Sequence, residues 1–401
     1  MAITQPGQPA SDPAQTTAGR TVLWPLLAAG FLTAFGAHAI AASLGRYAIG
    51  QHASLLELGV LLALYDGAEV VLKPAFGALA DRIGPRPVLI GGLLAFAAAS
   101  AGFVLAGQPD ALGLARLGQG AAAAAFSPAA AAVVAQLTPP TRRGRSFGTY
   151  GAWKGLGYTL GPLLGGALIT LGGFPVLFAT LAALGVAVAV WARLAVPAVP
   201  PVPKTRETLF GLGRRLTQPN FLRPVLALGA ASAALSVGVG FLPVRGAHLS
   251  PMATGTIVSL LAICAALVQP RAGRAYDTGR LPGRTGMAAG LLLAAAGFAL
   301  AAVATGPVFL GAAAVAIGVG AGLVTPLGFA ALAAQAPPGR TGQTMGAAEV
   351  GRELGDAGGP LLVAAIANPL GLGAGLLGLT GLLTAAGCLT NRGDSADRSA
   401  K

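Results

Sequence analysis

The sequence predicts an all-α membrane protein with twelve transmembrane helices arranged as two six-helix bundles. Of its 401 residues, 54% are hydrophobic and only 10% are charged, and the mean hydropathy is +0.72. Ordinary globular domains are about 25% charged, so a soluble protein of this length is excluded. The apolar runs are long and unbroken, which excludes the short alternating strands of a membrane β-barrel.

Twelve apolar runs reach the length of about 20 residues that an α-helix needs to cross a bilayer. They cover residues 22–44, 55–80, 87–107, 111–136, 146–170, 173–196, 221–243, 252–270, 285–304, 306–335, 343–367 and 369–390. The first run is long enough to span, so we expect a retained helix rather than a signal peptide.

The polar segments divide the chain into parts. A Pro-rich and then basic loop, 197–220, separates a first bundle, 21–196, from a second, 221–390. The end segments 1–20 and 391–401 are polar and are predicted to be disordered tails.

Arginine and lysine gather on one side of the predicted membrane. With twelve spans, both tails and the even-numbered connections share a side. Those connections hold Arg82, Arg86, Arg142, Arg143, Arg145, Lys204, Arg206, Arg214, Arg215, Arg271, Arg274, Arg280, Arg284 and Arg340, whereas the opposite ones hold only Arg46 and Arg245. Because such residues mark the cytoplasmic side, both termini are predicted to be cytoplasmic. The same bias accounts for the net charge of +13 without a nucleic-acid partner.

The two halves of the chain repeat. One pattern recurs 198 residues later, Pro139-Pro140-x-Arg142-x-Gly144-x3-Gly148 as Pro337-Pro338-x-Arg340-x-Gly342-x3-Gly346. Another recurs about 196 residues later, Gly77-x3-Asp81-x2-Gly84-x-Arg86 as Gly273-x3-Asp277-x-Gly279-Arg280. Parallel duplication predicts a pseudo-two-fold axis along the membrane normal, with a site between the bundles near the midplane.

Ionisable side chains lie inside several apolar runs, where each is costly unless it is paired. Asp66, Glu69 and Lys73 fall within about 60° of one another on a helix. A second group on the eleventh run falls within about 100°: Glu349, Arg352, Glu353 and Asp356. Arg116 and Lys154 complete the set.

Four bases against five acids leave one acid over, and an unpaired buried acid can carry a proton. We expect Asp66 or Glu69 to be that acid because both lie near mid-span. The alternative is a purely structural network.

Three local patterns resemble motifs of the major facilitator superfamily, and the resemblance covers nearly the whole chain. They are the loop Gly77-Ala-Leu-Ala-Asp81-Arg82-Ile-Gly84-Pro-Arg86, the span-four pattern Arg116-Leu-Gly-Gln119-Gly120, and the span-five pattern Gly157-Tyr-Thr-Leu-Gly161-Pro162-Leu-Leu-Gly165-Gly166. The last is associated in that family with drug–proton antiporters. Pro85 departs from the family's usual basic residue, although Arg82 and Arg86 remain.

The resemblance implies roles for the loop motif and for span four. Asp81 would meet the positive N-terminus of span eleven and form a cytoplasmic gate. The second copy, at Gly273, Asp277 and Arg280, is assigned to the same gate. A plain topogenic turn is the alternative. Arg116 would tune proton binding by a nearby acid, or would simply belong to a structural pair.

The resemblance also places spans two and eleven side by side, so that Asp66, Glu69 and Lys73 face Glu349, Arg352 and Glu353. Lys154 would face either the cavity or span eleven. The glycines of span five allow close helix packing, and Pro162 favours a kink there. Their further role in leak-free antiport is implied by the resemblance alone.

We therefore expect a monomeric secondary transporter of the bacterial inner membrane, without enzymatic activity, catalytic residues, metal or cofactor. It would export a small apolar or amphipathic compound by alternating access, driven by the proton gradient. By family analogy spans one, four, seven and ten line its cavity, and these are mostly apolar here. Uptake by proton symport is the alternative, and a membrane-embedded sensor or enzyme is a third hypothesis.

Overall fold

The computed structural model describes residues 23–40, 55–105, 109–198, 201, 217–246, 248–249 and 251–391. The predicted tail 1–20 lies outside these residues, as do most of the predicted loop 197–220 and all of the predicted tail 391–401 except its first residue, which ends α12.

The first half of the described chain forms five helical elements that make six crossings. They are the helix Leu23–Ile40, α2 (Leu55–Ile83), α3 (Pro85–Leu105), α4 (Pro109–Leu137) and α5 (Arg143–Ala195). The long α5 crosses twice because its backbone leaves the helical region at Gly172 and Gly173. Gly173 has a φ of +76°, which favours glycine and lets the chain reverse.

The second half forms six further helices. They are α7 (Pro219–Arg245), α8 (Pro251–Asp277), α9 (Gly283–Val303), α10 (Pro307–Gln335), α11 (Thr341–Leu370) and α12 (Leu372–Asn391). Nine helical segments in the described part are long and apolar enough to cross a membrane. Helices α2 and α11 are not among the nine, because each carries several charged residues inside its span, as the sequence predicts. The predicted fold class is confirmed.

Two predicted helix ends are too early, by three residues in α2 and by seven in α8. Helix α2 continues to Ile83, so Asp81 lies in its last turn rather than beyond it. Helix α8 runs through Pro270 to Asp277, although proline removes a backbone hydrogen bond. Neighbouring helices compensate for this loss inside a bundle, which a single sequence does not show.

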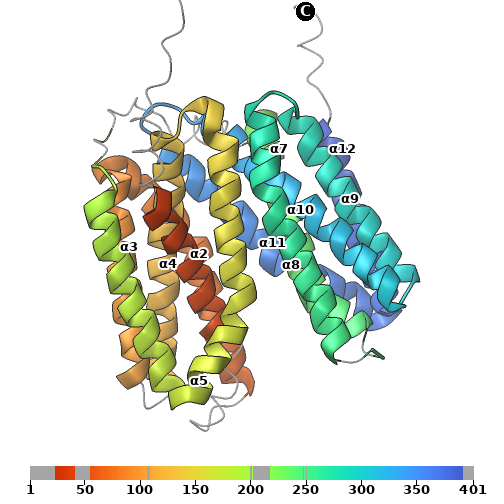
Figure 1. Ribbon diagram of the computed structural model, residues 1–401, viewed down its shortest axis with the longest axis horizontal. Helices are drawn as coiled ribbons and strands as arrows, with labels where there is room; N and C mark the ends of the chain where they lie inside the picture. Colours follow the sequence, from red (N-terminus) through yellow and green to blue (C-terminus); the bar gives the residue numbers. More distant parts are fainter. Residues whose placement is uncertain are drawn as a thin grey trace, which may run out of the picture.

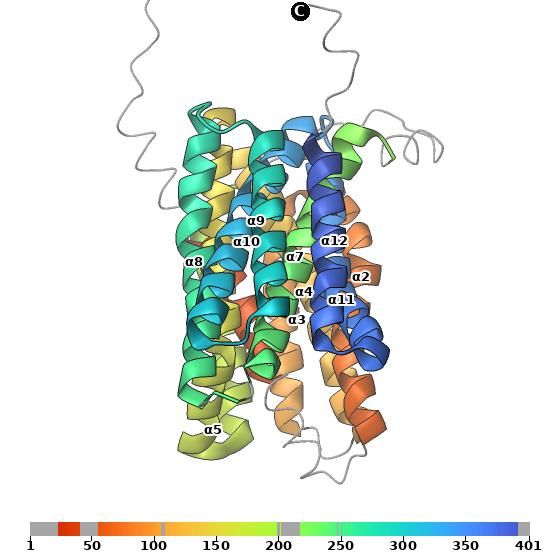
Figure 2. The same cartoon turned by 90° about the vertical axis from the view of Figure 1, so that its right-hand side faces the viewer.

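The helices form two bundles that stand side by side (Figure 1). Helices α2, α4, α8, α10 and α12 end at the same end of the molecule, where α3, α5, α7, α9 and α11 begin. We call this the gate end. The bundles meet along two seams, α2 with α11 and α5 with α8, which lie on opposite sides of the molecule (Figure 2).

Glycines of the span-five motif bring α5 close to the helix Leu23–Ile40. Gly157, Gly161 and Gly165 lie against this helix at successive turns. Gly355 and Gly359 of α11 lie in the same way against Gly229 and Ala233 of α7, which is the repeat in three dimensions.

Two glycines of α5, one of them in the motif, do not take part in this packing. No atom lies within 4 Å of a Cβ added at Gly155 or Gly166. The expectation that the span-five glycines allow close helix packing therefore does not hold at these two positions, where an added Cβ would meet open space. The described backbone of α5 leaves the helical region at Gly172 and Gly173, not at Pro162.

Substitution of Gly165 by alanine should destabilise the protein. A Cβ added there would lie 2.7 Å from the Cβ of Ala39, and overpacking of this kind costs about 1–3 kcal/mol. Gly166→Ala is the matched control, because its neighbour in the same helix has open space. The measurement is the thermal unfolding midpoint of the purified protein. Equal midpoints for the two variants would contradict the close packing of α5 on the first helix.

Candidate functional site

Two carboxylates close the gate end from opposite sides. Asp81 of α2 accepts hydrogen bonds from the backbone nitrogens of Gly342 and Gln343, at 2.6 and 2.8 Å. Asp277 of α8 accepts from those of Gly144 and Arg145, both at 2.8 Å. The two contacts are related by the sequence repeat.

Each carboxylate supplies a cap that its target helix lacks. Helices α11 and α5 begin after Arg340 and Arg142, and neither residue makes a side-chain capping bond. The first N–H groups of a helix have no partner within it and carry partial positive charge. An aspartate from the other bundle therefore satisfies them and ties the bundles together.

Glycines let the backbones approach at these two contacts. Gly77 faces Gly342, and Gly273 faces Gly144. Beyond the aspartates, Gly84 and Gly279 have φ angles of +92° and +71°, which favour glycine and turn the chain.

The arginines of the loop motif lie outside the capping contacts. Arg82 and Arg280 are exposed. Arg86 donates to the carbonyl of Arg193 at the end of α5.

A layer of buried charges lies next to the gate, and Lys73 is its centre. Its side chain is 0% exposed. Its Nζ lies 2.8 Å from Glu353 Oε1, 3.2 Å from Glu69 Oε2 and 3.8 Å from Glu349 Oε2. One lysine of α2 thus contacts a carboxylate of its own helix and two of α11.

Two further cations complete this layer. Lys154 of α5 contacts Glu349 at 3.1 Å and also donates to the Ser127 hydroxyl. Arg352 contacts Glu349 at 3.2 Å and donates to Glu353. The sequence left open whether Lys154 faces the cavity or span eleven, and the structure shows both, because Lys154 lines the cavity and contacts Glu349. We call Lys73, Lys154, Arg352, Glu69, Glu349 and Glu353 the ion network.

Among the described residues, the ion pairs of the network join α2 and α5 to α11 and do not involve α8. In the sequence repeat, Gln269 of α8 occupies the position that Lys73 has in α2. Gln269 packs against Gly148 and Gly151 of α5. The α5–α8 seam is therefore closed by uncharged groups at the level where the α2–α11 seam is closed by ion pairs.

A cavity of about 140 Å³ adjoins the network. It is lined by Thr33, Ala34, Ala37, His38, Tyr65, Asp66, Glu69, Arg116, Lys154, Tyr158, Arg352, Glu353 and Asp356. Its walls come from the first helix, α2, α4, α5 and α11, so the expectation that spans seven and ten line the cavity is wrong for this cavity. Its volume is below the range of about 300–1,000 Å³ typical of small-molecule sites.

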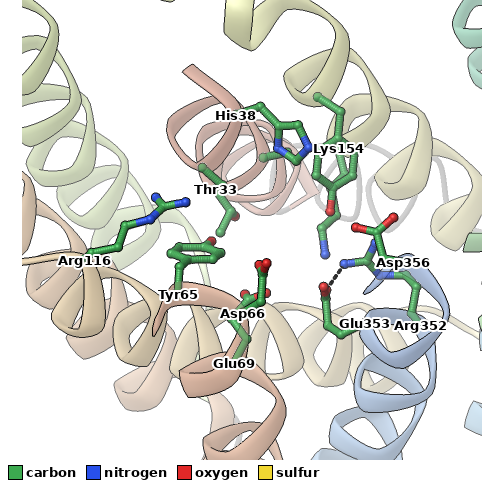
Figure 3. A pocket seen from close by; sticks show the side chains of 13 residues that line it. Thr33, His38, Tyr65, Asp66, Glu69, Arg116, Lys154, Arg352, Glu353 and Asp356 are labelled. Carbon is green, nitrogen blue, oxygen red and sulfur yellow. Dashed lines mark hydrogen bonds and ion pairs between the residues drawn. The ribbon is translucent and has the colours of Figure 1, made fainter. Parts of the chain in front are cut away.

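Two acids of the cavity stand outside the ion pairs of the network. Asp66 is exposed and points into the space between Tyr65 and Glu353 (Figure 3). Asp356 accepts a hydrogen bond from Ser232 of α7 at 3.4 Å. Glu69, in contrast, is buried and paired with Lys73.

Arg116 lines the cavity but has no ion pair among the described residues. Its Nη1 donates to Gln119 Oε1 at 2.9 Å, and its guanidinium lies 4.3 Å from the centre of the Tyr65 ring. A Cβ at Gly120 would lie 2.5 Å from the Tyr65 carbonyl oxygen, so the span-four motif seats α4 against α2. The expected pairing of Arg116 within the charge network is not seen.

Uncharged members of the site were not singled out from the sequence. Tyr65 and Tyr158 flank the cavity, and the Tyr158 ring lies 4.4 Å from His38 and 5.8 Å from the Arg352 guanidinium. Each tyrosine directly adjoins a residue that was singled out, Asp66 and Gly157. Ser127 and Ser232 carry no comparable signal.

A polar cavity between two pseudo-symmetric bundles, sealed at one end, is the arrangement of a secondary membrane transporter. The family model of the Major Facilitator Superfamily matches residues 17–360. The chain belongs to this family, whose members are transporters of small molecules rather than enzymes, and it is a multi-pass membrane protein.

Comparison with individual proteins agrees with this assignment. The chain is 40% identical over 110 residues to the class B tetracycline resistance protein of Escherichia coli, covering 27% of each chain. It is 31% identical over 190 residues to the inner membrane transport protein YajR of Escherichia coli, covering 45% of this chain and 40% of YajR. The chain thus spans about a quarter to two fifths of the length of the curated relatives it matches.

The fold is also that of a solved transporter. The crystal structure of the human organic anion transporter MFSD10 superposes with a TM-score of 0.77 at 21% identity, over 94% of this chain and 100% of that one.

Removal of Lys73 should destabilise the protein by about 3–5 kcal/mol, because it leaves the buried carboxylate of Glu69 without its cation and weakens the pairing of Glu353. We expect Lys73→Met to lower the free energy of unfolding and the double variant Lys73→Met/Glu69→Gln to restore part of the loss. The exposed Arg82→Gln is the control and should change it by less than about 0.5 kcal/mol. Strictly additive effects in the double-mutant cycle would contradict a direct Lys73–Glu69 interaction.

Proposed function

We propose that this protein exports a small amphipathic compound in exchange for protons. It would act as a monomer in a bacterial inner membrane, with no cofactor and the proton gradient as its energy source. The observation that carries the proposal is an acid, Asp66, that lines the cavity outside the ion network.

The charge balance of the site supports a proton-binding role. The three cations and three carboxylates of the ion network offset one another. The other charged residues among the described lining of the cavity are one cation, Arg116, and two acids, Asp66 and Asp356. The site therefore carries one excess negative charge when all its acids are ionised, and a single proton neutralises it.

Asp66 suits this role better than Glu69. Glu69 lies 3.2 Å from Lys73 Nζ, so a proton bound to Glu69 would disturb an ion pair of the network. Asp66 is exposed, and the structure gives it no ion pair among the described residues. A proton can thus reach Asp66 without opening the network.

The loop charges and the relatives support the orientation and the direction. The exposed arginines Arg82, Arg142, Arg271 and Arg280 lie at the gate end, which we infer to be cytoplasmic, as we infer for both termini. With the gate end closed, the cavity would receive protons from the outer side. Efflux is favoured by the resistance function in the name of the tetracycline relative, and the inner membrane by the name of YajR.

In this proposal, the capping contacts of Asp81 and Asp277 hold the gate end closed. For inward opening, α11 must leave α2 and α5 must leave α8, which breaks both capping contacts. Asp81, Asp277 and the glycines Gly77 and Gly273 would hold the closed state until substrate and proton occupancy favour the change.

Asp66→Asn should abolish proton coupling while leaving substrate exchange intact. In proteoliposomes with an imposed pH gradient, a panel of amphipathic compounds identifies one that the unmodified protein moves against proton entry. With that compound, gradient-driven transport by Asp66→Asn should fall to the level of empty liposomes, because no group is left to take up the proton.

Glu69→Gln is the matched control and should keep its coupling. Normal coupling in Asp66→Asn would contradict the assignment of the proton site. Accumulation of the compound in the direction of proton entry would contradict efflux and favour symport.

A further inference from the structure

The hydroxyl group of Tyr150 is idle in the closed-gate state that the structure describes. Tyr150 lies on α5 between the gate end and the ion network, and it is 4% exposed. Its hydroxyl oxygen is buried and makes no hydrogen bond among the described residues. A buried polar group without a partner costs free energy, so we look for its partner in another state of the protein.

The ring of Tyr150 is held inside the first bundle. A Cβ added at Gly30 of the first helix would lie 2.8 Å from this ring, so the ring and that helix are in close contact. Tyr150 therefore stays with the first bundle when the two bundles move apart.

Tyr150 is a neighbour of Lys154, a cation of the ion network. The two residues are four positions apart on α5 and share one face of it. Lys154 Nζ donates to the hydroxyl of Ser127 of α4 at 3.2 Å. The Tyr150 hydroxyl adjoins the same Ser127, although the two make no hydrogen bond. Because a lysine ammonium has three donors on a flexible side chain, it can reach the Tyr150 oxygen from Ser127.

Opening of the gate end takes away the one carboxylate that Lys154 contacts among the described residues. This carboxylate belongs to Glu349 of α11, in the second bundle. The network acid that stays in the first bundle, Glu69, already pairs with Lys73. Lys154 lies eleven residues inside α5, about 16 Å from its start, where a cation without partners is costly.

We propose that Tyr150 is a positioning residue for Lys154, whose ammonium donates to the Tyr150 hydroxyl once Glu349 has left. The Tyr150 hydroxyl can then donate to Ser127, so that Lys154 keeps two neutral acceptors inside the first bundle. This handover of Lys154 requires the alternating access of the proposed function, but not its substrate, its direction or its proton site.

A double-mutant cycle tests the handover without opening the gate. Glu349→Met removes the carboxylate from Lys154, so Tyr150 should become its partner in the closed state. We expect Tyr150→Phe alone to leave the thermal unfolding midpoint of the full-length protein unchanged or to raise it, because the hydroxyl is unpaired there. In the Glu349→Met background the same change should lower the midpoint by about 2–4 °C.

Tyr276→Phe is the matched control for the loss of a tyrosine hydroxyl. Tyr276 lies on α8 beside Gly144 and Gly283, and its substitution should have the same effect in both backgrounds. Equal effects of Tyr150→Phe in the two backgrounds would overturn the proposal. A lower midpoint for Tyr150→Phe alone would show that the hydroxyl is already paired in the closed state, and would overturn it too.

Exchange transport tests the same handover in the open state, and it decides if Glu349→Met does not fold. The compound found in proteoliposomes is exchanged across the membrane without a pH gradient. Tyr150→Phe should slow this exchange about tenfold, because a hydrogen bond to a charged group is lost in the open state only. An unchanged rate would overturn the role of Tyr150. If the unmodified protein exchanges no compound, the proposed function fails, and the double-mutant cycle still decides the role of Tyr150.

Discussion

Three carboxylates and three cations are buried at one level of this protein, and neither set could be buried without the other. An uncompensated charge in a membrane interior is expensive, whereas each member of this network has an opposite charge within 4 Å. Because Lys73 and Lys154 belong to one bundle and Glu349 and Glu353 to the other, the compensation is complete only while the bundles are together. The network is therefore both a structural requirement and a condition on movement.

Helix α11 connects this requirement to the gate. Its first turn is capped by Asp81, and its next turns carry the acids that Lys73 and Lys154 neutralise. On the opposite seam, Asp277 caps α5 in the same way, but the level of the network is filled by Gln269 and glycines. The repeat thus supplies two equivalent gate contacts and a single ion network. The ion pairs between the bundles therefore lie at α11, and none of those in the described part of the chain involves α8.

Much of this arrangement follows from the sequence and part of it does not. Run lengths and loop charges predict the helices, and the helical angles of Asp66, Glu69 and Lys73 predict that they share a face. The angular positions of residues around a helix do not show how far a side chain extends. It is the length of its side chain that lets Lys73 contact carboxylates on two helices. For the same reason the choice between Asp66 and Glu69 stayed open. For Arg116 the sequence left two roles open, tuning of a nearby acid or membership of a structural pair, and the described structure shows it bonded to Gln119 three residues along its own helix.

The most direct test measures whether the ion network holds the gate end closed. Cys264 and Cys388 are first replaced by alanine, so that spin labels attach only to cysteines introduced at Arg142 and Thr278. These two positions are exposed and lie on different bundles at the gate end. Double electron–electron resonance in nanodiscs then gives the distance between them. The account predicts one short distance for the otherwise unmodified protein and an added, longer population when Lys73 is replaced by methionine. An unchanged distribution in the folded Lys73→Met variant would contradict it.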